Sequence, residues 1–216
     1  MPSATSKLKT LDLKSSGLSK ERFIQLKVLN TPGKIQDFLN ALPFNFEKKG
    51  ETCRSVERAL HEKEAHCFEG ALIAACALWI NGERPLLLDL KATNADMDHV
   101  VVLFTRDGHY GAISKTNHGV LRFREPIYKS VRELAMSLFH EYFLKSGVKT
   151  LRSYSKPYDL SKEKINWISG EEELFNLSRK LDKSPHTKIL TPKMIKNLRK
   201  AEEIEIKMGE ITDWKN

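Results

Sequence analysis

The sequence predicts an α+β fold in which a buried central helix packs on an antiparallel sheet and further helices flank this core. Residues 67–80 (CFEGALIAACALWI) are apolar all round, which is typical of a buried helix. Residues 99–106 and 109–114 have strand patterns, and the Asp107-Gly108 pair between them is a strong hairpin signal. Because the helical patterns stand before and after this region, an α+β layer arrangement is favoured over a parallel βαβ series.

The N-terminal third predicts three helices. Ser19 is the expected N-cap of the first, and Thr31-Pro32-Gly33 separates it from the second. The three expected helical ranges are 19–30, 34–42 and 52–64. Asn81-Gly82 is expected to end the central helix, with Gly82 in a left-handed C-cap.

The expected sheet continues on both sides of the hairpin. A short strand is expected at 85–90 and a further one at 120–124, followed by an amphipathic helix at 130–144. Residues 151–160 look like an extended arm, and helical patterns at 171–181 and 192–208 follow it. The resulting division is a flexible N-terminal segment (1–18), an α+β domain (19–147) and a basic helical C-terminal extension (148–216).

The charge of the chain lies on its flanks. The net charge is +8: residues 1–20 have four lysines and one acid (+3), residues 145–216 have 16 basic and 11 acidic residues (+5), and the middle balances. Basic flanks favour weak contact with nucleic acid or an acidic partner. No apolar run reaches the ~20 residues of a membrane span, and the N-terminus has no apolar signal core. Three cysteines without a CxxC pair indicate a reducing interior, so we expect a cytoplasmic protein.

Cys67 stands where the polar lead-in meets the apolar helix, between His66 and Glu69. A helix N-terminus stabilises a thiolate through its dipole, and its unpaired N–H groups can bind an oxyanion. His99 opens a strand 32 residues later and can take and return the thiol proton. Cys67 is therefore the candidate nucleophile and His99 the candidate base, whereas Cys53 and Cys76 are expected to be structural.

The order of these residues resembles the transglutaminase-like cysteine proteins, a branch of the papain-like fold. The resemblance rests on CFEGAL (67–72), DHVVVLF (98–104) and GHYGAISKTN (108–117), and it covers about residues 50–145. It implies a papain-like core with a cysteine at the start of the central helix, a histidine at the start of a strand, and an Asp on the next strand, four positions after an aromatic residue.

The third member of the site differs from the family pattern. Tyr110 fits the aromatic residue, but Ser114 stands where the family has Asp. Asn117 is the nearest amide that can orient His99. If the strand continued past Lys115, residue parity would place Asn117 on the opposite face from Ser114. We expect the strand to end by Lys115, so we place Asn117 slightly ahead of Ser114. Tyr110 is a candidate substrate-binding residue, as are Arg122 and Arg124, which share one strand face and suit an anionic group.

The expected function is thiol-dependent hydrolysis or transfer at an amide or peptide bond, with peptidase or amidase chemistry implied by the resemblance. No cofactor is expected. His66, Cys67 and His99 offer three zinc ligands, but adjacent ligands at a helix start diverge, so no metal is expected. The alternative is an inactive module of the same fold that binds a protein or nucleic acid through its basic flanks.

Overall fold

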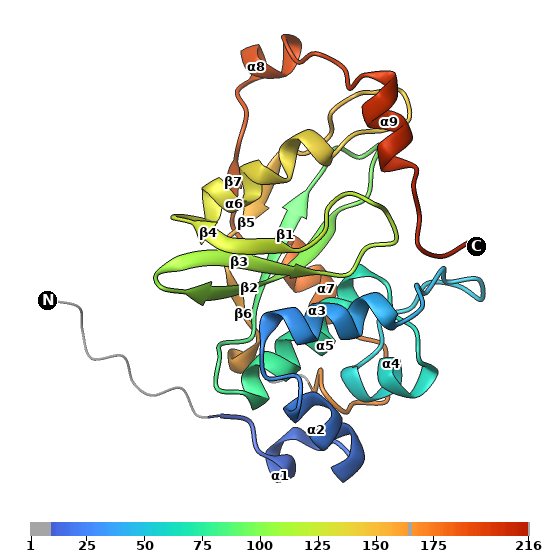
Figure 1. The fold of residues 1–216 in the computed structure, drawn as a ribbon, viewed down its shortest axis with the longest axis vertical. Coiled ribbons are helices and arrows are strands. Elements are labelled where there is room, and N and C mark those ends of the chain that lie inside the picture. Colours follow the sequence, from blue (N-terminus) through green and yellow to red (C-terminus); the bar gives the residue numbers. More distant parts are fainter. Residues whose placement is uncertain (1–9, 164–165, 216) are drawn as a thin grey trace, which may run out of the picture.

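A seven-stranded antiparallel sheet forms the middle of the molecule, with helices on both faces (Figure 1). The computed structural model describes residues 10–163 and 166–215. The helices in this part of the chain are α1 (Leu13–Ser16), α2 (Lys20–Lys27), α3 (Pro32–Ala41), α4 (Val56–Glu62), α5 (Cys67–Ile80), α6 (Val131–Ser137), α7 (Phe175–Asp182), α8 (Pro192–Lys196) and α9 (Glu203–Gly209). Two 3-10 turns, η1 (Phe139–Glu141) and η2 (Leu160–Lys162), accompany them.

The sheet has the strand order β4-β3-β2-β1-β5-β7, and β6 pairs with another part of β1. The strands are β1 (Leu86–Lys91), β2 (His99–Arg106), β3 (His109–Ser114), β4 (Arg124–Tyr128), β5 (Ser153–Ser155), β6 (Tyr158–Asp159) and β7 (His186–Lys188). Every pairing is antiparallel. The predicted α+β class with an antiparallel sheet and a central helix is therefore confirmed at this level.

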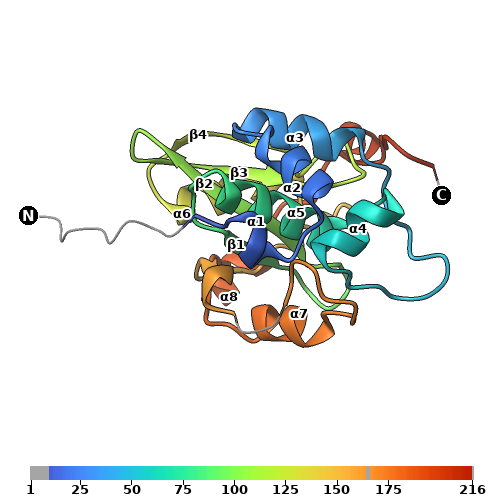
Figure 2. The same ribbon diagram turned by 90° about the horizontal axis from the view of Figure 1, so that it is seen from below.

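Helix α5 lies at the centre because its sequence has no polar side after the first turn. Twelve of its 14 residues are buried, Cys76 among them. The helix has the predicted bounds and ends at Asn81, where Gly82 takes the left-handed conformation (φ 92°) that glycine adopts without strain. Figure 2 shows α5 close to α2, α3 and the sheet, in agreement with the burial of most of its residues.

The strands alternate between two apolar cores. Leu87, Val102 and Ile113 pack on the side of α5, whereas Leu88 and Val101 pack on the side of α6. In β2 both kinds of position are buried up to Phe104. Since both faces of the central strands are covered, side chains that meet solvent must lie at the strand ends.

The N-terminal and C-terminal segments belong to this body. Residues 1–9 of the predicted flexible segment lie outside the described residues, but Leu11 and Leu18 are buried against the α5 core. The segment 148–216, predicted as a helical extension, contributes β5, β6 and β7 to the sheet. The extended arm at 151–160 is thus paired main chain.

Among the predicted elements whose limits differ from the structure, three have a clear local cause. The strand expected at 120–124 begins only at Arg124, as β4. Leu121 has φ 61° and its N–H binds the Glu141 carboxylate, so the chain before Arg124 is still a loop. The helix expected at 130–144 ends at Ser137, whose hydroxyl binds the Leu134 carbonyl at 2.6 Å. The helix expected at 192–208 is interrupted between α8 and α9, where the Ala201 N–H binds the Gly147 carbonyl at 2.8 Å.

A search of the described residues finds no helix whose length and apolar character would allow it to cross a membrane.

The contact of α5 with β3 depends on Gly70. A Cβ built there would lie 2.4 Å from Lys115 Cβ, so a side chain must push the helix and strand apart. We expect Gly70→Ala to lower the free energy of unfolding by about 1–3 kcal/mol, the usual cost of overpacking. The matched control is Gly33→Ala, since nothing lies within 4 Å of a Cβ at that helical position. This change should raise the free energy of unfolding by about 0.4–1 kcal/mol. Urea unfolding measures both, and equal effects would contradict this packing.

Candidate active site

The two residues predicted as nucleophile and base meet at one end of the sheet. Cys67 is the first residue of α5, and His99 is the first residue of β2. Both line one cleft of about 280 Å³. The thiol of Cys67 interacts with the imidazole of His99.

Ser114 is the residue that orients His99. Its Oγ lies 2.8 Å from His99 Nε2 and 2.6 Å from the carbonyl of Leu121. The hydroxyl has one proton, which it donates to the Leu121 carbonyl, so its oxygen accepts from Nε2–H. His99 Nδ1 is then the nitrogen that remains for the thiol. Ser114 is 2% exposed, so this orientation is protected from water.

Asn117, which the sequence analysis placed ahead of Ser114, has another task. Its side chain accepts from the N–H of Trp214 at 2.9 Å and donates to the carbonyl of the same residue at 3.0 Å. Strand β3 ends at Ser114, so Asn117 lies in the following loop and lines the cleft without binding His99. The preference for Asn117 as the orienting residue is therefore corrected to Ser114.

The three cysteines have different environments. Burial by itself raises the pKa of the half-buried Cys67 thiol, but the interactions with His66 and His99 outweigh it and lower the pKa to about 5. Burial, together with the charges of Glu69 and Glu173, raises the pKa of Cys53 to about 12. Burial alone raises the pKa of Cys76 far above the usual range. Cys67 is the thiol that is ionised at neutral pH.

His66 is a second histidine next to the thiol. It is the N-cap of α5, with Nδ1 at 3.3 Å from the N–H of Phe68 and Nε2 at 3.1 Å from the carbonyl of Thr52. Burial lowers the pKa of His66, but the bond to Cys67 and the nearby negative charges outweigh burial and raise it to about 9. A protonated Nδ1 has no lone pair for Phe68, so the cationic form gives up that cap bond.

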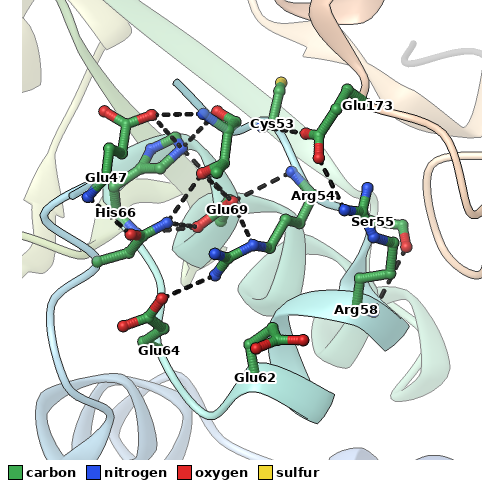
Figure 3. Close-up of polar contacts among 12 residues, drawn as sticks. Glu47, Cys53, Arg54, Ser55, Arg58, Glu62, Glu64, His66, Glu69 and Glu173 are labelled. Atoms are coloured by element: carbon green, nitrogen blue, oxygen red, sulfur yellow. Dashed lines mark hydrogen bonds and ion pairs between the residues drawn. The ribbon is translucent and has the colours of Figure 1, made fainter. Parts of the chain in front are cut away.

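The start of α5 is held by the buried carboxylate of Glu69, which is 0% exposed. One oxygen accepts from Thr52 Oγ1 at 2.9 Å and from the N–H of Arg54 at 3.1 Å. The other accepts from Asn45 Nδ2 at 3.1 Å and from the N–H of His66 at 3.2 Å. Figure 3 shows Glu69 between Arg54 and His66. This network ties the loop before α4 to the residue that precedes Cys67.

The walls of the cleft come from distant parts of the chain. Phe44, Met97 and Tyr142 contribute apolar surface from three loops, and Ile206 contributes from α9. The residues that follow α9 are bound to the loop after β3. The carbonyl of Ile211 accepts from the N–H of Gly119 at 2.8 Å, and Trp214 is bound by Asn117. The C-terminal segment 203–215 is thus a wall of the cleft.

The residues predicted to bind substrate do not line this cleft. Tyr110 lies four residues from Ser114, at the hairpin end of β3, about 13 Å away along the strand. Arg122 is paired with Asp213, and Arg124 is paired with Glu141. Each guanidinium group already has a carboxylate partner, so neither is available to bind an anionic substrate.

One cluster of the described residues has the spacing of a metal site, and it does not include Cys67. Asp89, Asp98 and Asp182 bring carboxylate oxygens within 4.8 Å of one another. Each is already partnered: Asp89 by His186 at 3.1 Å, Asp98 by the N–H of Ala92, and Asp182 by Lys91. Nothing further points to an ion there.

Two features of the site have little local signal in the sequence. The bonds from Glu69 to Asn45 and Thr52 join residues 24 and 17 positions apart, and the tail bonds of Asn117 span 97 positions. The Glu three positions after His66 is a capping-box spacing, and this was the one signal available for Glu69.

Comparison of the chain with protein-family models and with curated proteins found no match to either.

The cysteine environments predict selective alkylation. With iodoacetamide, Cys67 should react at a rate that rises with pH up to about 6 and is then constant, because its pKa is lowered to about 5. Cys53 and Cys76 should stay unmodified at pH 7, since both thiols are buried and protonated. Peptide mass spectrometry against pH measures all three rates. A Cys67 rate that still rises above pH 8 would contradict the lowered pKa.

The bond from His99 to Ser114 predicts a tautomer. In the native protein at high pH, ¹⁵N NMR of the imidazoles should show His99 protonated at Nε2. Ser114→Ala removes an interaction worth about 1 kcal/mol, so the ratio of the two tautomers should change by about fivefold. Asn117→Ala is the matched control and should leave the tautomer unchanged, because its amide binds Trp214. The reverse pattern would restore Asn117 as the orienting residue.

Proposed function

We propose that the protein is a thiol-dependent acyl-transfer enzyme with a transglutaminase-like, papain-related core, acting on an amide or peptide carbonyl. The observation that carries the proposal is the row Cys67–His99–Ser114, in which an ionised thiol at a helix N-terminus faces an oriented imidazole at a cleft. The order of the row along the chain is that of the family named above, with Ser in the third place.

The proposed reaction begins with the Cys67 thiolate. Its sulfur bonds to the carbonyl carbon, and the carbonyl electron pair moves to oxygen, where the N–H of Cys67 at the start of α5 contributes to its stabilisation. The C–N bond then breaks, and His99 gives its proton to the leaving nitrogen. A thioester on Cys67 remains.

The second half returns the enzyme to its starting state. His99 takes a proton from the acceptor, whose oxygen or nitrogen bonds to the thioester carbon, and the C–S bond breaks to release the thiolate. Water as acceptor gives hydrolysis and an amine gives transfer. Hydrolysis is the form that the resemblance favours. The thiolate must stay reduced, which suits a cytoplasmic location.

The apolar walls of the cleft support an acyl group with an apolar side chain. Met97, Tyr142 and Ile206 surround the space beside Cys67, and apolar surface binds apolar groups by removing them from water.

The proposal predicts an acyl-enzyme on Cys67. With p-nitrophenyl acetate, the protein should release p-nitrophenolate in a burst that approaches one equivalent, followed by slower turnover. Mass spectrometry of the quenched protein should find the acetyl group on Cys67. Cys67→Ala should lose both burst and adduct, whereas Cys76→Ala, a change in the core of α5 away from the cleft, should keep them if folded.

A second candidate function is an inactive module of the same fold that binds a protein or nucleic acid. The observation in its favour is the exposed basic surface around α8, to which Lys188, Lys193 and Lys196 belong. Figure 1 shows α8 projecting from the body of the molecule. A folded protein that forms no acetyl adduct on Cys67 would favour this module over the enzyme.

A further inference from the structure

We propose that two histidines serve Cys67 in separate tasks: His66, which lies off the cleft, holds the thiolate, and His99, which lies on the cleft, moves the protons of the reaction. This division of tasks rests on the proposed acyl-transfer function and adds to it a residue that a single cysteine–histidine pair does not require.

The first step concerns position. His99 lines the cleft together with Cys67, so its ring can reach a leaving group or an attacking water. The lining residues of this cleft do not include His66. Its ring is folded back on the first turn of α5, against Phe68 N–H and the Thr52 carbonyl, and its side chain is 15% exposed. The side chains of His66 and Cys67 also interact with each other, so His66 can support the thiolate without reaching the substrate.

The second step concerns charge. His66 Nε2 is surrounded by oxygen atoms: the Thr52 carbonyl at 3.1 Å, Glu69 Oε1 at 3.6 Å and Glu47 Oε1 at 4.0 Å. Two carboxylates and a carbonyl favour a protonated ring. The neighbouring thiolate adds a third negative charge. Protonation of Nδ1 gives up the bond from the Phe68 N–H, and these three negative charges favour the cation over that single bond while the thiolate is present.

His99 has a different environment. The partner of its Nε2 is the neutral Ser114 hydroxyl, 2.8 Å away. The carboxylates nearest in the chain have other partners, since Asp98 accepts from the N–H of Ala92 and Asp96 accepts from Thr150 Oγ1. Tyr142, another titratable group near Cys67, donates to the Met97 carbonyl. His99 is thus oriented by a neutral partner, as suits a group that gives and takes a proton.

The protons balance as follows. The reactive state has a thiolate with both rings protonated. His99 gives its proton to the leaving nitrogen when the C–N bond breaks, and it takes one back from water when the C–O bond forms. His66 keeps its proton throughout. Its positive charge is therefore already beside Cys67 when the thiolate leaves the thioester.

The test compares His66→Asn with His99→Gln in the full chain. Asn is a preferred N-cap, so the helix start is preserved while the titrating ring is lost. His61→Asn is the matched control, because His61 lies in α4 with a side chain that is 79% exposed. The probes are iodoacetamide for the thiolate and p-nitrophenyl acetate for acylation and turnover. Circular dichroism melting checks the fold of each variant.

The two histidine variants should impair different steps, thiolate formation in His66→Asn and turnover of the acetyl-enzyme in His99→Gln. His66→Asn should move the pH midpoint of Cys67 alkylation up by about 1–2 units, which slows alkylation at pH 5 by about 5- to 50-fold, while the acetyl-enzyme still turns over. His99→Gln should leave the midpoint below that of His66→Asn and still give a burst with p-nitrophenyl acetate, whose phenolate needs no proton to leave. Its acetyl adduct on Cys67 should then persist, because no base activates water.

Three results separate the inference from the proposed function. If His99→Gln raises the alkylation midpoint more than His66→Asn does, the division of tasks is overturned while the enzyme stands. If His66→Asn behaves like wild type in both assays, His66 is a structural cap and the inference is wrong. If wild-type Cys67 gives neither selective alkylation nor an acetyl adduct, the acyl-transfer function itself fails.

Discussion

The site depends on one buried carboxylate. Glu69 has no exposure to water, yet it accepts bonds from two side chains and two main-chain N–H groups and lies beside the Arg54 guanidinium. A buried charge with all its acceptors filled stabilises one geometry, whereas removal of a partner leaves it uncompensated at a cost of several kcal/mol, about 3–5 for a buried pair. The direction of His66, and with it the start of α5 and the position of Cys67, follows from this arrangement.

The covering of both faces of the sheet explains why the candidate site lies at the strand ends. Its middle strands are covered on one face by α5 and on the other by α6, so neither face has room for a ligand. Polar side chains that must meet a substrate are then confined to strand ends, where the chain enters loops. His99 begins its strand and Ser114 ends the next one, and antiparallel pairing brings those two ends together.

Elements with strong local signals were predictable. The apolar run of α5 and the Asp107-Gly108 hairpin gave the correct bounds, and these bounds placed Cys67 and His99 at the same end of the core. The choice between Ser114 and Asn117 was not predictable in the same way, because it depends on Trp214, which is 97 positions away and carries no signal in the loop sequence. The strands after residue 147 were missed for a related reason: they are two or three residues long and exist through pairing with β1 and with each other.

The cleft wall formed by residues 203–215 has a consequence for synthesis on the ribosome. Helix α5 and strands β1–β4 emerge long before that wall, so the nascent chain can bring Cys67 and His99 together while one side of the cleft is still open. The loop of Asn117 gains its partner Trp214 when residues 203–215 have left the exit tunnel. Assembly of the thiol–imidazole pair can therefore precede enclosure of the space in which it would act.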